Sequence, residues 1–471
     1  MGIKDFHKWM KSQYISAFKT KWLSSYDHVY IDLNFALHNC SYKAKNINDI
    51  YERLYIFIDG VLHMTLPRVS LVLGADGPAP LAKLLLQRKR RLTKSRGQET
   101  IDGVSSIIFT PGTQFMDTLE SGLKPYTDFI KKIYNIDILF EINNDDEAEL
   151  KLKRTMMKNI KLYPNNSHVI ITNDADVIVM LMTLPDLTKI YVYEKGFQNS
   201  ETISMGKLLL LHVEKVSCSF YPNLDFSAMS IFMGNDYLPK INFITLEKLW
   251  ASYSDAIICD HRGLILNSDL QINIPFLCKI LFGILKRTKQ HFIKRILPSN
   301  LCHPMYKNYM DGYTWCLTTY NTAVCTRYNY MYGFQCSPHP LGLLINIKKN
   351  PKLIITSNEI FNSIDRKLYT ILLIPNKYSD LINKDYKNFI KKVSILYDEE
   401  NCTKCGDFYK KIKNLKCQLD KKNDEDNINI INKNIIQTQK ILSLHKKSHT
   451  DLTLDDIITI INKYKKYKSL L

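Results

Sequence analysis

The chain has no long uncharged apolar run. Nowhere in its 471 residues do eighteen consecutive positions stay apolar and uncharged, so no segment is expected to cross a bilayer as a helix. The first residues contain no apolar stretch of the signal-peptide type. They also lack the Ser or Thr that a myristoylation site requires, because Phe6 occupies that position. Neither secretion nor membrane attachment is therefore expected.

A regular cysteine framework is absent too. Eleven cysteines are scattered along the chain without regular spacing. In a chain without a secretion signal, this pattern is typical of reduced thiols inside a cell. We therefore expect the cytoplasm as its location, with the nucleus as the alternative.

Acidic residues are in the minority. The chain has 46 Asp and Glu against 64 Lys and Arg, which gives a formal net charge of +18. This excess favours a polyanionic partner, and nucleic acid fits it better than a membrane surface. A chain of this length is long for a single core, so two or three domains are expected.

The most informative stretch is Leu71–Arg91, with the sequence LVLGADGPAPLAKLLLQRKRR. Its first residues form an apolar run that predicts a buried strand, and Asp76 follows in a turn rich in Gly and Pro. A helix is expected next, and four of its polar residues share one face at spacings of four, three and one: Lys83, Gln87, Arg90 and Arg91. Taken alone, this face could equally be a solvated helix surface.

Other carboxylates follow apolar runs in the same way. Strands are expected at 26–33, 71–73, 136–142, 168–172 and 190–193, alternating with helices, and this alternation predicts a mainly parallel α/β sheet. Ligands bind at the carboxyl ends of the strands in such sheets. The acids at or after these ends, with one more in a later Gly-Asn-Asp turn, are Asp32, Asp76, Glu147, Glu149, Asp174, Asp176 and Asp236.

Converging carboxylates repel one another unless divalent cations neutralise them. A site with only oxygen ligands favours Mg²⁺ or Mn²⁺ over zinc. Any single acid could instead cap a helix or form a turn. Seven such acids beside a helix lined with donors are better explained by metal-dependent phosphodiester chemistry.

Ordered motifs in residues 1–340 resemble those of the Xrn-type 5′→3′ exoribonucleases. The segments that carry the resemblance are MGIKDFHKWM, VYIDLNFALHNC, LVLGADGPAPLAKLLLQRKRR, FTPGTQFM, DDEAELKLKR, NDADVIVML and FMGNDYLPKI. The resemblance implies a fold of the PIN or flap-nuclease type. It also implies that the seven acids bind two Mg²⁺ ions, with Mn²⁺ as a substitute. The short region after the catalytic half is similar to a compact, viral type of member.

The resemblance also implies a binding site for the RNA 5′ end. Lys83, Gln87, Arg90 and Arg91 match the family's 5′-monophosphate pocket, and His38 matches the histidine that stacks on the first base. The family places tryptophans where this chain has Tyr328 and Tyr330, so these two are the candidate stacking partners of His38. Without the resemblance, the aromatic cluster around them is typical of a packed core.

The implied activity is metal-dependent 5′→3′ hydrolysis of RNA that carries a 5′-monophosphate, such as decapped RNA, to nucleoside monophosphates. The expected partner is single-stranded RNA and no membrane; the sequence identifies no protein partner. A flap-endonuclease-like DNA nuclease is one alternative, although no glycine pair of the DNA-gripping type follows Asp236. A catalytically inactive RNA-binding or scaffold relative is the other.

Three regions are expected along the chain. Residues 1–245 form the catalytic nuclease domain, and residues 246–345 form a smaller, mostly helical region that completes the active-site pocket. Residues 346–471 form a helical extension rich in Lys, Asn and Ile that carries none of the motifs above. Within it, 421–429 is expected to be a polar linker and 453–464 a capped helix.

Overall fold

A computed structural model describes most of the chain. The described residues are 3, 5–18, 23–97, 104–143, 145–195, 200–216, 219–288, 304–334, 336–351, 360–393, 396, 402–419, 425–446 and 454–469. They divide into two compact units. Unit 1 comprises Met1–Tyr42, Ile47–Lys83 and Leu119–Ser363, and unit 2 comprises Lys43–Asn46, Leu84–Thr118 and Ile364–Leu471. The three-region division expected from the sequence follows other boundaries and stays a prediction.

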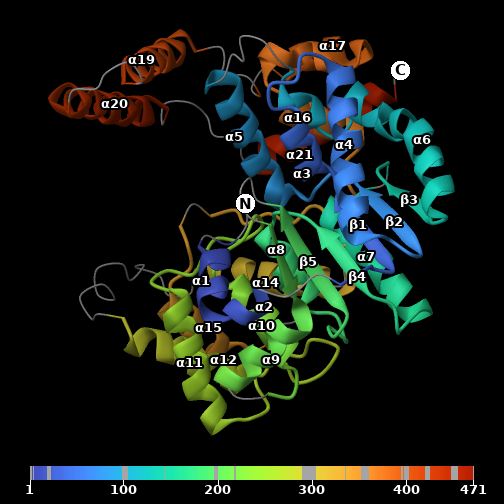
Figure 1. Cartoon of the computed structure of the whole chain (residues 1–471). Coiled ribbons are helices and arrows are strands. Elements are labelled where there is room, and N and C mark those ends of the chain that lie inside the picture. The colour runs from blue at the N-terminus through green and yellow to red at the C-terminus, as the bar shows by residue number, and fades with distance from the viewer. Residues whose placement is uncertain are drawn as a thin grey trace. The chain divides into compact units, whose positions relative to one another are not determined.

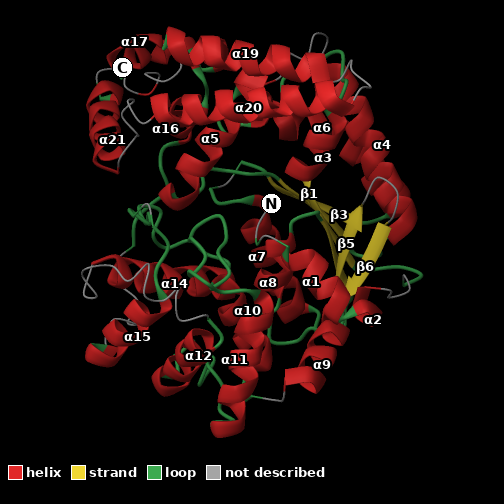
Figure 2. Ribbon diagram, turned by 90° about the vertical axis from the view of Figure 1, so that its left-hand side faces the viewer, coloured by secondary structure: helices red, strands yellow, loops and turns green. Residues whose placement is uncertain are grey.

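Unit 1 is built on one six-stranded sheet with the order β3-β2-β1-β4-β5-β6 (Figures 1 and 2). Its strands are β1 (His28–Asp32), β2 (Ser70–Gly74), β3 (Asp137–Glu141), β4 (His168–Ile171), β5 (Ile190–Lys195) and β6 (Ser200–Ser204). Neighbouring strands are parallel except β5 and β6, which pair antiparallel. The predicted mainly parallel sheet flanked by helices is confirmed. The antiparallel edge strand β6 was not predicted.

The central strands are apolar because helices cover the sheet. Strands β2 and β4 are buried along their whole length, as expected for parallel strands packed on both faces. Helix α7 (Ala148–Leu162) packs against β1, β2 and β3, and α9 (Met205–Val216) packs against β5 and β6. Strand β1 has β2 on one side and β4 on the other, so the strand order changes direction at β1. Ligands bind at such a switch point in open α/β sheets.

Unit 1 contains further helices. They are α1 (Phe6–Gln13), α2 (Ile15–Phe18), α3 (Leu33–Cys40), α4 (Ile47–Thr65), α8 (Ala175–Leu181), α10 (Pro222–Ile231), α11 (Leu246–Cys259), α12 (Ile274–Lys286), α14 (Pro304–Thr322) and α15 (Pro340–Lys349). Two helices run from one unit into the other along the chain, namely α5 (Leu81–Gly97) and α6 (Gln114–Tyr134). No described helix has the length and apolar character to span a membrane.

Unit 2 contains the helical C-terminal segment. Its helices are α16 (Arg366–Leu373), α17 (Lys387–Lys392), α19 (Thr403–Leu419), α20 (Glu425–Lys446) and α21 (Leu454–Lys468), with short 3₁₀ turns at Ser106–Phe109, Asn376–Leu381 and Lys384–Tyr386. Helices α19 and α20 pack side by side (Figure 1). Helix α20 already begins at Glu425, so the linker prediction is wrong for 425–429; residues 421–424 lie outside the described part. The helix predicted at 453–464 is α21, and its predicted cap Thr453 also lies outside that part.

Candidate active site

Six of the seven predicted acids lie at or just after the carboxyl ends of β1, β2, β3 and β4. Asp32 ends β1 and caps α3, accepting hydrogen bonds from the backbone N–H of Asn34 at 3.0 Å and of Phe35 at 3.3 Å. Asp174 caps α8 after β4 and accepts from the backbone N–H of Asp176 at 3.0 Å. These residues do serve as helix caps, as the simpler interpretation of each acid alone proposed. Capping therefore fixes the direction in which each carboxylate points.

Asp76 is held by an asparagine that the sequence did not single out. The Asn34 side chain donates from Nδ2 to Asp76 Oδ2 at 2.8 Å and accepts from the Asp76 backbone N–H at 2.9 Å. The second oxygen of Asp76 accepts from the backbone N–H of Ala148 at 3.0 Å. Asp76 is thereby fixed between the β1 and β3 ends of the sheet. The only sequence signal for Asn34 was its position two residues after Asp32.

The two glutamates lie at the start of α7. Glu147 is its N-cap residue and is 1% exposed, and Glu149 lies in its first turn. Burial raises the pKa of Glu149 well above its usual value, and Glu147 and Asp76 act in the same direction. Burial likewise raises the pKa of Asp32 to about 7 and that of Asp176 to about 8, reinforced by neighbouring carboxylates. Acids that repel one another in this way form one electrostatic cluster.

Lys83 supplies a positive charge inside this cluster. Its ammonium group forms an ion pair with Glu147 and lies 3.4 Å from Asp236 Oδ2. Although burial alone would lower the pKa of Lys83, the carboxylates led by Glu147 raise it well above its usual value. Lys83 is therefore charged at any physiological pH. The predicted role of Lys83 in phosphate binding is untested, and this geometry makes it a counter-ion of the acids.

A pocket opens among these residues within unit 1. It is lined by Lys83, Glu149, Leu150, Asp174, Asp176, Met180, Asp236, Tyr237 and Tyr320. The Tyr237 hydroxyl donates to Glu147, and Asp176 accepts from the backbone N–H of Ile3 at 3.0 Å. Tyr237 and Ile3 were not predicted as site residues. Tyr237 directly follows a predicted acid, whereas nothing in the sequence linked Ile3 to Asp176.

The donor set fits a hard divalent cation. The cluster offers carboxylate oxygens, and burial and mutual repulsion raise their pKa values by disfavouring the ionised form, a penalty that a bound cation would relieve. Within the described residues, the one His/Cys/Asp/Glu group with three ligand atoms inside 4.8 Å is elsewhere, at His7, Glu194 and Glu201. Lys11 pairs with Glu201 there, and His7 pairs with Glu194. That second group is therefore already neutralised by side chains.

The predicted base-stacking residues have different exposures. His38 lies near the end of α3 and is exposed. Tyr328 and Tyr330 are only 6% and 3% exposed. The Tyr330 hydroxyl donates to the backbone oxygen of Asn308 at 3.0 Å, and the Tyr328 hydroxyl donates to Asp146. Neither tyrosine ring presents an open face in this structure, so their stacking role stays a prediction.

Asp146 connects Tyr328 to the acid cluster through a hydrogen bond. Asp146 directly precedes Glu147 and adopts a left-handed backbone conformation with φ of 78°. Its side chain pairs with Arg154 and accepts from Tyr328, and its backbone oxygen accepts from the N–H of Gly77 at 2.8 Å. A strained residue held from three sides sets the path of the chain into Glu147.

The remaining predicted phosphate-binding residues lie on the part of α5 that belongs to unit 2. Gln87 is 9% exposed, and Arg90 and Arg91 are partly buried. Arg91 donates from Nε to Thr110 Oγ1 at 2.8 Å and from Nη1 to the Gln87 backbone oxygen at 3.3 Å. The helix and the shared face expected from the spacing are present.

Comparison with known families identifies the first part of the chain. Residues 1–192 match the family model described as XRN 5′-3′ exonuclease N-terminus. These residues are therefore similar to the N-terminal part of the XRN 5′-3′ exonucleases. Six of the seven predicted acids fall within the matched residues.

Curated relatives of the family are much longer than this chain. It is 26% identical over 298 residues to 5′-3′ exoribonuclease 1 of Schizosaccharomyces pombe, covering 51% of this chain and 22% of the relative. It is 23% identical over 353 residues to 5′-3′ exoribonuclease 1 of Homo sapiens, covering 62% of this chain and 21% of the relative. The chain thus spans about a fifth of the length of these relatives.

Solved structures give weaker matches. The catalytic core of Rad2 in complex with DNA aligns with 12% identity and a TM-score of 0.36, covering 79% of this chain and 99% of that one. The bacteriophage T5 D15 flap endonuclease with DNA and metal ions aligns with 11% identity and a TM-score of 0.32, covering 78% and 99%. Likeness at this level adds no argument about activity.

Proposed function

We propose that this protein is a metal-dependent 5′→3′ exoribonuclease acting on RNA with a 5′-monophosphate and releasing nucleoside monophosphates. The observation that carries the proposal is the cluster of family acids at the carboxyl edge of one parallel sheet, with pKa values raised by burial and mutual repulsion. Such a cluster suits divalent cations that carry a phosphodiester. The curated relatives named 5′-3′ exoribonuclease support the same activity.

Each group of residues has a role in this proposal. Asp32, Asp76, Glu147, Glu149, Asp174, Asp176 and Asp236 would hold two Mg²⁺ ions, with Mn²⁺ as a substitute. Held by these carboxylates, such ions would supply Lewis-acid chemistry, which would activate a water and stabilise the leaving oxygen. Capping contacts hold Asp32 and Asp174 in place, and Asn34 holds Asp76, so the donors are oriented before the substrate arrives.

The 5′ end is proposed to be recognised by the residues of α5 and by His38. Lys83, Gln87, Arg90 and Arg91 provide cationic and neutral donors, which match a phosphate dianion. His38 is exposed, and stacking of the first base on its ring is proposed. A pocket that binds a monophosphate excludes a cap or a triphosphate. Decapped or processed single-stranded RNA in the cytoplasm, with the nucleus as the alternative, is therefore the proposed substrate.

The direct test compares RNAs that differ only at the 5′ end. Purified protein with Mg²⁺ is given the same single-stranded RNA carrying a 5′-monophosphate, a 5′-triphosphate or a 5′-hydroxyl, and released mononucleotides are measured. Preferential degradation of the monophosphate form is expected. Equal rates for the three RNAs would contradict the phosphate pocket.

The same assay separates the alternatives. A flapped DNA duplex cut faster than single-stranded RNA would favour the DNA nuclease. Asp174→Ala and Asp176→Ala are each expected to abolish mononucleotide release, because each removes a carboxylate from the centre of the cluster. RNA binding without any release by the unmodified chain would favour the inactive relative.

A further inference from the structure

A buried tyrosine of the C-terminal segment forms a hydrogen bond with Gln87. Tyr369 of α16 is fully buried, and its hydroxyl donates to Gln87 Oε1 at 2.6 Å. We propose that Tyr369 is a positioning residue that orients the Gln87 amide for binding of the RNA 5′-phosphate. This inference rests on the proposed function. It gives the C-terminal segment, which lies outside the residues matched by the family model, a role in substrate recognition.

The chemistry of the amide explains why orientation matters. A glutamine side chain ends in an oxygen that accepts and a nitrogen that donates, and the two can exchange places by rotation. Phosphate oxygens only accept, so Gln87 can help to bind a phosphate only with Nε2 towards it. A hydroxyl that donates to Oε1 holds the oxygen on the Tyr369 side. Among the described residues the structure gives Nε2 no acceptor, which leaves this nitrogen available for a ligand.

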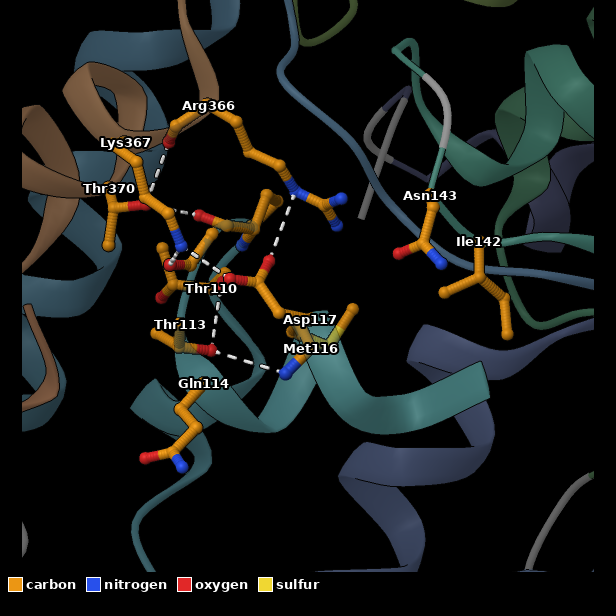
Figure 3. A network of polar contacts seen from close by, with 12 residues as sticks. Thr110, Thr113, Gln114, Met116, Asp117, Ile142, Asn143, Arg366, Lys367 and Thr370 are labelled. Carbon is orange, nitrogen blue, oxygen red and sulfur yellow. Dashed lines mark hydrogen bonds and ion pairs between the residues drawn. The ribbon is translucent and has the colours of Figure 1, made fainter. Parts of the chain in front are cut away.

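Helix α16 is fixed firmly enough to act as a reference for Gln87. Thr370 donates from Oγ1 to the Pro111 backbone oxygen at 2.6 Å, and Lys367 donates to the Gly112 backbone oxygen at 3.1 Å and pairs with Asp117 (Figure 3). Gly112 has φ of 86°, and a Cβ there would lie 2.1 Å from Thr370 Oγ1. Only glycine therefore allows this close approach of the turn to α16.

The same turn holds the neighbouring arginine of the predicted pocket. Thr110 precedes Pro111 and accepts from Arg91 Nε at 2.8 Å. Arg88, one residue after Gln87, is buried and donates from Nη1 to the Leu372 backbone oxygen at 2.7 Å. The segment of α5 that carries Gln87 and Arg91 is thus attached to α16 both directly and through the turn. Tyr369 is the contact that acts on the amide itself.

The test is Tyr369→Phe, which keeps the buried ring and removes only the hydroxyl. Binding of single-stranded RNA is measured in EDTA, by fluorescence anisotropy, with 5′-monophosphate and 5′-hydroxyl forms of one sequence. We expect about tenfold weaker binding of the monophosphate form, equivalent to about 1.4 kcal/mol. Binding of the 5′-hydroxyl form is expected to stay unchanged. In turnover with divalent cations, KM should rise for the monophosphate RNA while kcat changes little.

A matched control and a double variant make the result specific. Tyr467→Phe removes another hydroxyl of the same segment, one that donates to the Asp385 backbone oxygen at 2.9 Å, and it should bind both RNAs as the unmodified chain does. If Tyr369 acts through the amide, adding Tyr369→Phe to Gln87→Ala should weaken binding no further.

The outcomes distinguish this inference from the proposed function. Unmodified protein that binds both RNAs equally would overturn the phosphate assignment itself. Unmodified protein that prefers the monophosphate, with the same preference in Tyr369→Phe, would overturn only the role of Tyr369. Equal weakening of both RNAs by Tyr369→Phe would also overturn it, because a general loss of structure and not the amide would then be the cause.

Discussion

The left-handed residue before Glu147 offers a sharp test of how the acid cluster is built. Asp146 has φ of 78° and is held by Tyr328, Arg154 and the backbone N–H of Gly77. Asp146→Gly and Asp146→Ala both remove the side-chain contacts. They differ in the backbone, because glycine adopts this conformation freely and alanine does not.

The difference between the two variants can be estimated. A left-handed conformation disfavours an L-residue such as alanine by about 1–2 kcal/mol. A glycine costs about 0.4–1 kcal/mol more than alanine in the free energy of folding, because the unfolded chain has more conformations at a glycine. We therefore expect the glycine variant to have the higher free energy of unfolding, by about 0.8 kcal/mol, which is the difference between the midpoints of these two effects. Both variants should be less stable than the unmodified chain, since a buried hydrogen bond to a charged group contributes about 1.5–3 kcal/mol.

Urea unfolding followed by fluorescence measures this difference, and divalent-cation binding provides a second measurement. The glycine variant should retain more of the cation affinity than the alanine variant, because its backbone still directs Glu147 into the cluster. Tyr328→Phe should destabilise the unmodified chain but leave the Asp146→Gly variant nearly unchanged, since their contact is already lost there. An alanine variant as stable as the glycine variant would refute the left-handed conformation.

Three further predictions concern single groups. Burial raises the pKa of Asp32 to about 7 and of Asp176 to about 8, so cation binding must displace protons. The affinity for Mn²⁺, measured by calorimetry, should therefore rise at least about tenfold from pH 6 to pH 8.5. A pH-independent affinity would contradict the shared cluster. Asn34→Ala should lower cation affinity or activity about 10–100-fold by releasing Asp76, whereas unchanged titrations would show that Asp76 needs no support. Burial lowers the pKa of Lys153 to about 7, so above that pH the unfolded chain binds more protons than the folded chain does. The free energy of unfolding should therefore increase from pH 7 to pH 10, and Lys153→Met should abolish this increase in unfolding experiments.

The strand ends were predictable because the information is local. An apolar run followed by an acid and a helical period marks each of Asp32, Asp76 and Asp174 within a few residues of sequence, and the parallel sheet then brings them to one edge. The family motifs added the assignment of roles. The edge strand β6 was missed because Ser200–Ser204 is mostly polar, and its pairing with β5 leaves no apolar pattern in the sequence.

The missed features depend on contacts between distant residues. Lys83 pairs with Glu147 across 64 positions of sequence, and helix periodicity gives only the face of Lys83 and not its partner. Tyr328 lies 182 positions from Asp146, and whether an aromatic ring is buried or open to a base is decided by the packing around it. The pairing of Tyr369 with Gln87 lies beyond local patterns for the same reason.

Lys83 has a consequence for how the protein behaves when divalent cations are scarce. Its ammonium group lies beside Glu147 and Asp236 and stays charged, so it competes with an incoming cation for these carboxylates. A cation that binds there has to share or replace this partner, so part of its binding energy is spent on exchange. If the cluster binds cations as proposed, Lys83 would lower the affinity for them, while it keeps the acids assembled when no cation is bound.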